Sequence, residues 1–71
     1  MMQRFGEKLR TLREKQGYSI RKLARELGFA SHAHISRIEA GKKPTLDFVL
    51  LIAQFFEVSF DQLMNDELEL D

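Results

Sequence analysis

The sequence predicts a small all-α domain, a compact bundle of five short helices. Three observations support this fold class: no stretch alternates apolar and polar residues as a strand does, the only proline is Pro44, and apolar residues recur at helical spacing between glycine-containing turns. With 71 residues, the chain holds one domain. We expect this domain to cover residues 1–65, and an acidic C-terminal tail at residues 66–71 to fray.

The first two helices have clear boundaries. The first is expected over residues 3–16, with Phe5, Leu9 and Leu12 on one core-facing side. The second follows Ser19, whose hydroxyl can cap a helix, and stops at Gly28.

The remaining three helices follow similar signals. A third helix is expected over residues 31–40, with Ile35 and Ile38 facing inward. Thr45 can cap a fourth helix that runs to about residue 57. Ser59 and Gln62 have the spacing of a capping box, which predicts the start of a fifth helix.

Charge divides the chain into two halves. All 11 basic residues lie at or before Lys43 together with four acidic ones, which gives a net charge of +7, and the segment from Pro44 onward has seven acidic residues and no basic one. A basic half of this kind can face a polyanion. No cysteine is present, so disulfides and thiolate metal sites are excluded.

Neither a metal site nor an enzyme is expected. His32 and His34 stand at i and i+2, which on a helix point about 200° apart, so one ion cannot bind both. The chain has no catalytic constellation, no phosphate-binding loop and no cofactor motif. The longest apolar run is far below the roughly 20 residues that cross a bilayer. We therefore expect a cytoplasmic protein without cofactors.

Residues 19–44 form the most informative segment. Two short amphipathic helices, joined at Gly28 and closed by Gly41, carry mixed charge outside and a narrow apolar stripe inside. This is the sequence pattern of a helix-turn-helix, which presents its second helix to the major groove of DNA.

The stretch from Phe5 to Met64 resembles the Cro and phage-repressor type of helix-turn-helix, also called XRE-like. The matching residues are Gly6, Leu9, Leu12-Arg13, Leu23-Ala24, Leu27-Gly28, Ile35-Ser36, Ile38-Glu39, Gly41, the stretch from Pro44 to Val58, Ser59 and Leu63. Two features depart from the family pattern. Ile20 stands where a phosphate-contacting glutamine is usual, and the turn is one residue longer, near Phe29-Ala30.

The resemblance implies which side chains meet DNA. The base-reading positions correspond to His32, Ala33, Ser36 and Arg37. Arg37 is the strongest of these, because its guanidinium can donate two hydrogen bonds to guanine, worth about 1–3 kcal/mol of discrimination. The alternative for Arg37 is a phosphate contact or a solvated position. The expected phosphate contacts come from both edges of the helix-turn-helix: Ser19, Arg21, Lys22, Ser31, Lys42 and Lys43.

Two further sets of residues have expected structural roles. The resemblance implies that Arg13 and Glu39 form an internal salt bridge. A second apolar stripe on the fourth helix, which Phe60 and Met64 can extend, predicts a homodimer contact: Phe48, Leu51 and Phe55. The alternative is that helices one and five cover this stripe within one chain.

These observations predict a repressor-like transcriptional regulator. We expect a homodimer that binds double-stranded DNA at an inverted-repeat operator through the major groove, with a protein regulator as a possible further partner. The alternative is a protein-interaction module, such as an antitoxin or an antagonist of another regulator, which the acidic tail favours.

Overall fold

Hydroxyl side chains begin three of the five helices, as the sequence predicts. Ser19 Oγ accepts the backbone N–H of Lys22 at 3.0 Å, and Thr45 Oγ1 accepts that of Phe48 at 3.1 Å. At the fifth helix, Ser59 and Gln62 bond to each other's backbone N–H groups in a complete capping box. The predicted capping interactions are confirmed.

A computed structural model describes residues 3–70 and is all-helical over that range. The predicted fold class is confirmed, with helices close to the expected boundaries. They are α1 (Phe5–Lys15), α2 (Ile20–Glu26), α3 (Ala33–Glu39), α4 (Leu46–Phe56) and α5 (Phe60–Met64). Gly28, after α2, has φ +86°, a backbone conformation that glycine adopts without strain.

The third helix begins two residues later than predicted. Ser31 lies before α3, where its Oγ accepts the N–H of Ala33 at 3.1 Å, and His32 occupies the N-cap position. The preceding Phe29 packs on the core, with its ring centroid 5.9 Å from that of Phe48. Residues 29–32 are therefore non-helical, and α3 starts only at Ala33.

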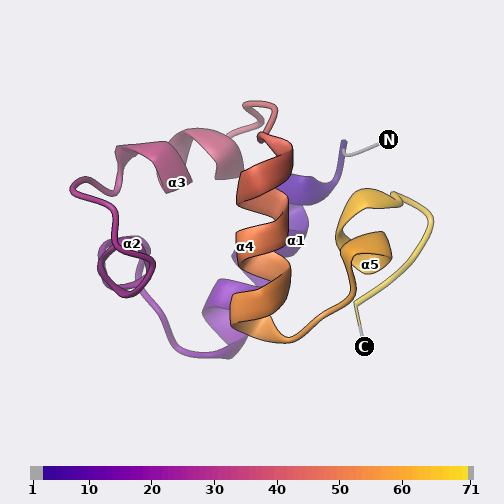
Figure 1. The fold of residues 1–71 in the computed structure, drawn as a ribbon, viewed down its shortest axis with the longest axis horizontal. Helices are drawn as coiled ribbons and strands as arrows, with labels where there is room; N and C mark the ends of the chain where they lie inside the picture. The colour runs from indigo at the N-terminus through magenta and orange to yellow at the C-terminus, as the bar shows by residue number, and fades with distance from the viewer. Residues whose placement is uncertain (1–2, 71) are drawn as a thin grey trace.

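One core holds the helices together. α1 packs against α3 and α5, α2 packs against α3, and α4 packs against α5. Figure 1 shows α2 and α3 on one side of α4, and α5 with the C-terminal segment on the other. The fully buried apolar residues are Phe5, Leu9, Leu23, Ile35, Ile38, Val49, Ile52 and Leu63.

Gly6 allows α1 to approach the end of α3 closely. A Cβ atom at this position would lie 2.5 Å from the carbonyl oxygen of Ile38 and 3.2 Å from the Cα of Glu39. Both are backbone atoms, so a side chain at residue 6 would push the two helices apart. This contact fixes the position of α3 relative to α1.

The acidic C-terminal segment is attached to α1, which differs from the frayed tail expected. The Asp66 carboxylate accepts the backbone N–H groups of Gln3 and Arg4 at 3.1 and 3.0 Å, and so caps a helix 62 residues earlier in the chain. The Arg4 guanidinium bonds to the Glu69 carboxylate and to the carbonyl of Asp66.

Lys8 on α1 binds the C-terminal segment through buried hydrogen bonds. Its side chain is almost fully buried, at 1% exposure, and its Nζ donates to the carbonyls of Gln62, Asn65 and Leu68. The Asn65 and Leu68 distances are 2.8 and 2.7 Å. Burial, with Arg4 nearby, lowers the pKa of Lys8.

Within residues 3–70, no helix has the length and apolar content needed to cross a membrane.

Candidate nucleic-acid interface

The outer face of α3 carries the predicted base-reading side chains. Ile35 and Ile38 are fully buried, which fixes the rotation of this helix about its axis. Ser36 and Arg37 are exposed, and Ala33 is half-buried one turn before Arg37. The three therefore lie on the side of α3 that faces away from the core.

The two histidines have different surroundings. The ring of His34 packs beside the core, with its centroid 5.0 Å from that of Phe48 and 5.4 Å from that of Phe29. His32 is half-exposed at the start of α3. Within residues 3–70, no three histidine, cysteine or acidic side chains gather as a metal-binding group would require.

The exposed side of α2 is strongly basic. Arg21, Lys22 and Arg25 are all exposed, and Arg21 and Arg25 are one turn apart. Lys22 Nζ lies 5.4 Å from the ring centroid of Tyr18, within range of a cation–π contact. Ser19 Oγ accepts the backbone N–H of Lys22 as the cap of α2, and this bond does not use its O–H, which can donate to a phosphate oxygen.

Lys42 and Lys43 lie in the loop between α3 and α4. Both are exposed, and the Lys42 N–H bonds to the carbonyl of Arg37 at 3.0 Å, so the loop is tied to the end of α3. The following Pro44 is buried. The loop therefore presents two cations beside the outer face of α3.

Ion pairing separates the basic residues into two groups. On α1 and just before it, Arg4, Arg10 and Arg13 pair with acidic side chains. By contrast, the six exposed basic residues of α2, α3 and the loop after α3 form no ion pair with any residue in the described range 3–70: Arg21, Lys22, Arg25, Arg37, Lys42 and Lys43. The cations left free to meet an external anion are those of α2, α3 and the loop after α3.

Arg13 and Glu39 come together across α1 and α3. Arg13 Nε donates to Glu39 Oε2 at 2.7 Å and Nη2 donates to Oε1 at 3.1 Å, a bidentate pair. The side chains are 9% and 5% exposed. The hydrogen bonds with Glu39 raise the pKa of Arg13. Arg13 Nη1 also donates to the carbonyl of Tyr18, at 2.9 Å, which ties the α1–α2 turn to the same pair.

The structure corrects one member of the expected dimer contact. Phe48 is only 4% exposed, because Phe5, Phe29 and His34 surround its ring within one chain. It cannot contribute a free apolar surface.

The other expected dimer residues remain partly accessible. They are half-buried on the edge of the core: Leu51, Phe55, Phe60 and Met64. The most exposed apolar side chains of α4 are instead Leu46 and Leu50, at 59% and 43% exposure.

Sequence reasoning missed Arg25 and Lys8. Arg25 repeats the charge of Arg21 one turn later, a like-charge spacing that costs a helix a few tenths of a kcal/mol and could have drawn attention to it. No sequence signal marks Lys8, because its acceptors are backbone carbonyls 54 to 60 residues away.

Comparison with known families agrees with this geometry. The sequence profile of the helix-turn-helix family matches residues 9–63, most of the chain. Searches among curated proteins and among solved structures returned no match. The matched range includes α2, α3 and the Arg13–Glu39 pair. The chain belongs to the helix-turn-helix family of the Cro and phage-repressor type, and it is a DNA-binding regulatory domain.

Proposed function

We propose that this protein is a repressor-like transcriptional regulator that binds an inverted-repeat operator as a homodimer. The observation that carries the proposal is the set of six basic residues, from Arg21 to Lys43, that no acidic side chain in residues 3–70 pairs with. Arg37 lies on the outer face of α3, and the other five lie on the elements beside it. An α-helix such as α3 fits into the major groove of DNA. If Arg37 reads a base and the other five residues meet phosphates, the logarithm of affinity should fall with the logarithm of salt at a slope of about −4.5 per subunit.

Within this interface, Arg37 is assigned to base reading and Lys43 to a phosphate. Arg37→Ala should relax preference at one base pair of each half-site and cost about 1–3 kcal/mol against the best operator. Lys43→Ala should weaken all sequences alike and reduce the salt slope by about one. If Arg37→Ala weakens every sequence equally, Arg37 is a phosphate ligand instead.

The dimer contact is assigned to the apolar edge of α4 and α5. Leu51 and Phe55 supply half-buried area, Phe60 and Met64 extend it, and the exposed Leu50 adjoins it on α4. Apolar side chains that remain this accessible favour association with a second copy. Sedimentation of Leu51→Glu at micromolar concentration should give the monomer mass where the parent gives twice that mass.

Selection of bound sequences from random DNA tests the whole proposal. A repressor-like dimer should select two inverted half-sites whose centres are about 34 Å apart, one helical turn of DNA. A protein-interaction module would select none. The acidic tail, which favoured that alternative, is engaged by Arg4 and Lys8 on its own chain.

A further inference from the structure

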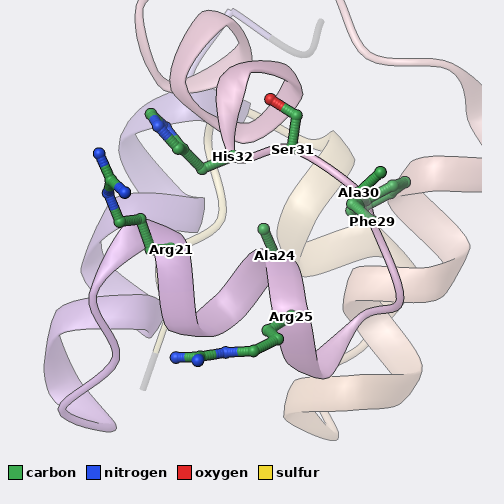
Figure 2. Close-up of a pocket in the computed structure, with 7 residues that line it drawn as sticks. All are labelled: Arg21, Ala24, Arg25, Phe29, Ala30, Ser31 and His32. Atoms are coloured by element: carbon green, nitrogen blue, oxygen red, sulfur yellow. The ribbon is translucent and has the colours of Figure 1, made fainter.

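A small apolar pocket opens between the start of α3 and the first turns of α4. This α3–α4 pocket has a volume of about 240 Å³. Its lining residues come from the segment before α3, from α3 and from the start of α4: Phe29, His34, Thr45, Asp47, Phe48 and Leu51. In Figure 2, the Phe29 side chain leaves its segment on the side away from Arg21 and His32. Phe29 therefore stands between this pocket and the basic hollow that Arg21 and His32 line.

Aromatic and aliphatic side chains form most of the pocket wall. Phe48 is only 4% exposed, and the ring centroids of Phe29 and His34 lie 5.9 and 5.0 Å from its own. The His34 ring stands at 86° to that of Phe48. Leu51, which is half-buried, lines the α4 side. Rings that meet at different angles can contact both the face and the edge of a further aromatic ring.

The size of the pocket suits one aromatic ring with a short substituent. An apolar cavity of about 150 Å³ is large enough to hold benzene. A volume of about 240 Å³ therefore leaves room for a ring and a short chain of further atoms. It lies below the roughly 300–1,000 Å³ of sites for drug-sized ligands, so a larger molecule would not be enclosed.

The charge at the edge of the pocket is negative and uncompensated. Among the described residues that line the pocket, Asp47 is the only acidic one, and none is a lysine or an arginine. Its carboxylate is exposed and forms no ion pair with any residue in the range 3–70. No basic residue follows Lys43 in the sequence, so α4 has no cation to offer it. An unpaired carboxylate beside an apolar pocket complements a cation attached to an apolar body.

The pocket contacts α3 without including its base-reading side chains. His34 belongs to the first turn of α3, and Phe29 lies in the segment that precedes this helix. None of the four residues expected to read bases lines the pocket: His32, Ala33, Ser36 and Arg37. A ligand here would therefore touch the start of α3 and leave these four side chains free.

We propose that the α3–α4 pocket binds a small organic cation, an aromatic ring that carries a protonated amino group on a short chain. The ring packs against Phe29, Phe48 and Leu51, and the ammonium group lies beside the Asp47 carboxylate. Binding of this ligand does not require DNA. The inference therefore goes beyond the proposed function and does not depend on it.

The probe is 2-phenylethylamine, titrated into the isotope-labelled protein without DNA and followed by NMR. The amide resonances of the lining residues should shift and saturate with a Kd of about 1 mM, as expected for a ligand of this size. Nuclear Overhauser effects should connect the ligand ring to Phe29 and Leu51. Two reference compounds separate the ring from the charge. Butylamine lacks the ring and 3-phenylpropanoate carries the opposite charge, so both should bind at least about fivefold more weakly.

Asp47→Asn and Asp61→Asn form a matched pair of variants. Each aspartate is exposed, stands second in its helix after a capping hydroxyl, and forms no ion pair within residues 3–70. Asp47→Asn should weaken 2-phenylethylamine about fivefold, the upper range for an exposed ion pair, and should remove the preference over 3-phenylpropanoate. Asp61→Asn changes a residue outside the pocket and should bind the amine as the parent does. Thermal melting checks that both variants are folded.

Four results would overturn the inference. The first is the absence of saturating shifts at the pocket below about 10 mM amine, ten times the expected Kd. The second is equal binding of the amine and the carboxylate, and the third is parallel weakening by the two variants. The fourth is loss of ligand binding as protein concentration rises, which would show that a second copy of the chain fills the pocket at Leu51. None of these measurements involves DNA, so each of them leaves the proposed DNA binding as it stands.

Discussion

The Glu39→Leu substitution should strand the Arg13 guanidinium inside the domain. It removes the acceptors of Arg13 Nε and Nη2, now 2.7 and 3.1 Å away. Within residues 3–70, the guanidinium then retains its hydrogen bond to the Tyr18 carbonyl at 2.9 Å and its ion pair with the exposed Glu14 carboxylate at 3.9 Å. A buried charge that loses its partner costs about 3–5 kcal/mol.

That cost is large for a chain of this length. At roughly 0.05–0.15 kcal/mol per residue, the whole domain has a free energy of unfolding of about 4–11 kcal/mol. The thermal midpoint should fall by about 12 °C or more, because a domain of this size loses about 4–8 °C per kcal/mol.

A double-mutant cycle separates this mechanism from general loss of packing. Arg13→Met with Glu39→Leu replaces the pair by apolar side chains, which is often neutral or stabilising, so the double variant should recover most of the loss. Recovery should be incomplete by about 1 kcal/mol, because the Tyr18 carbonyl also loses its donor.

Urea unfolding at neutral pH measures all four corners of the cycle. Arg10→Met is the control, since Arg10 is 64% exposed and lies 3.7 Å from Glu39. It should change the free energy of unfolding by about 0–1 kcal/mol. The reasoning fails if both single variants unfold like the parent, or if the double variant loses the sum of the two.

Three other predictions concern how α1 is held. Gly6→Ala should lower the free energy of unfolding by about 1–3 kcal/mol despite the better helix propensity of alanine, because its Cβ would meet the Ile38 carbonyl; an equal or higher melting temperature would contradict this. Lys8→Met should lower the free energy of unfolding, measured with urea, by about 2–6 kcal/mol, since the Gln62 and Leu68 carbonyls lose their donor, the Asn65 carbonyl keeps the Leu68 N–H, and each carbonyl left unsatisfied costs about 1–3 kcal/mol; a change below 1 kcal/mol would show that water replaces the ammonium. Lowering the pH should release the C-terminal segment. The backbone N–H of Arg4 lowers the pKa of Asp66 below its ordinary 3.8, and the Arg4 guanidinium lowers the pKa of Glu69 below its ordinary 4.5. The unfolded chain therefore takes up these protons at higher pH than the folded chain, so the stabilisation is complete above these ordinary values and is lost as the pH falls through the folded pKa values. The amide resonance of Arg4, followed by NMR, should report that transition, and a midpoint at the ordinary carboxyl pKa would contradict the contact.

The sequence alone predicts the features that depend on neighbours within one or two turns. Ser19, Thr45 and the Ser59–Gln62 capping box begin helices because each side chain reaches an N–H group three residues away. The inward direction of Ile35 and Ile38 follows from helical periodicity, and so does the outward direction of Arg37.

The tertiary structure decides what depends on residues distant in the sequence. Periodicity places Phe48 and Phe55 on the same side of α4 but cannot tell which of them other segments cover; Phe5, Phe29 and His34 together bury Phe48. Lys8 donates to backbone carbonyls, which every residue has, so its role cannot be predicted from the sequence. The hollow that Arg21, Arg25 and His32 line likewise exists only because packing brings the start of α3 beside α2. Local hydrogen bonds form between neighbours in the chain, whereas burial and pocket formation depend on which segments meet in space.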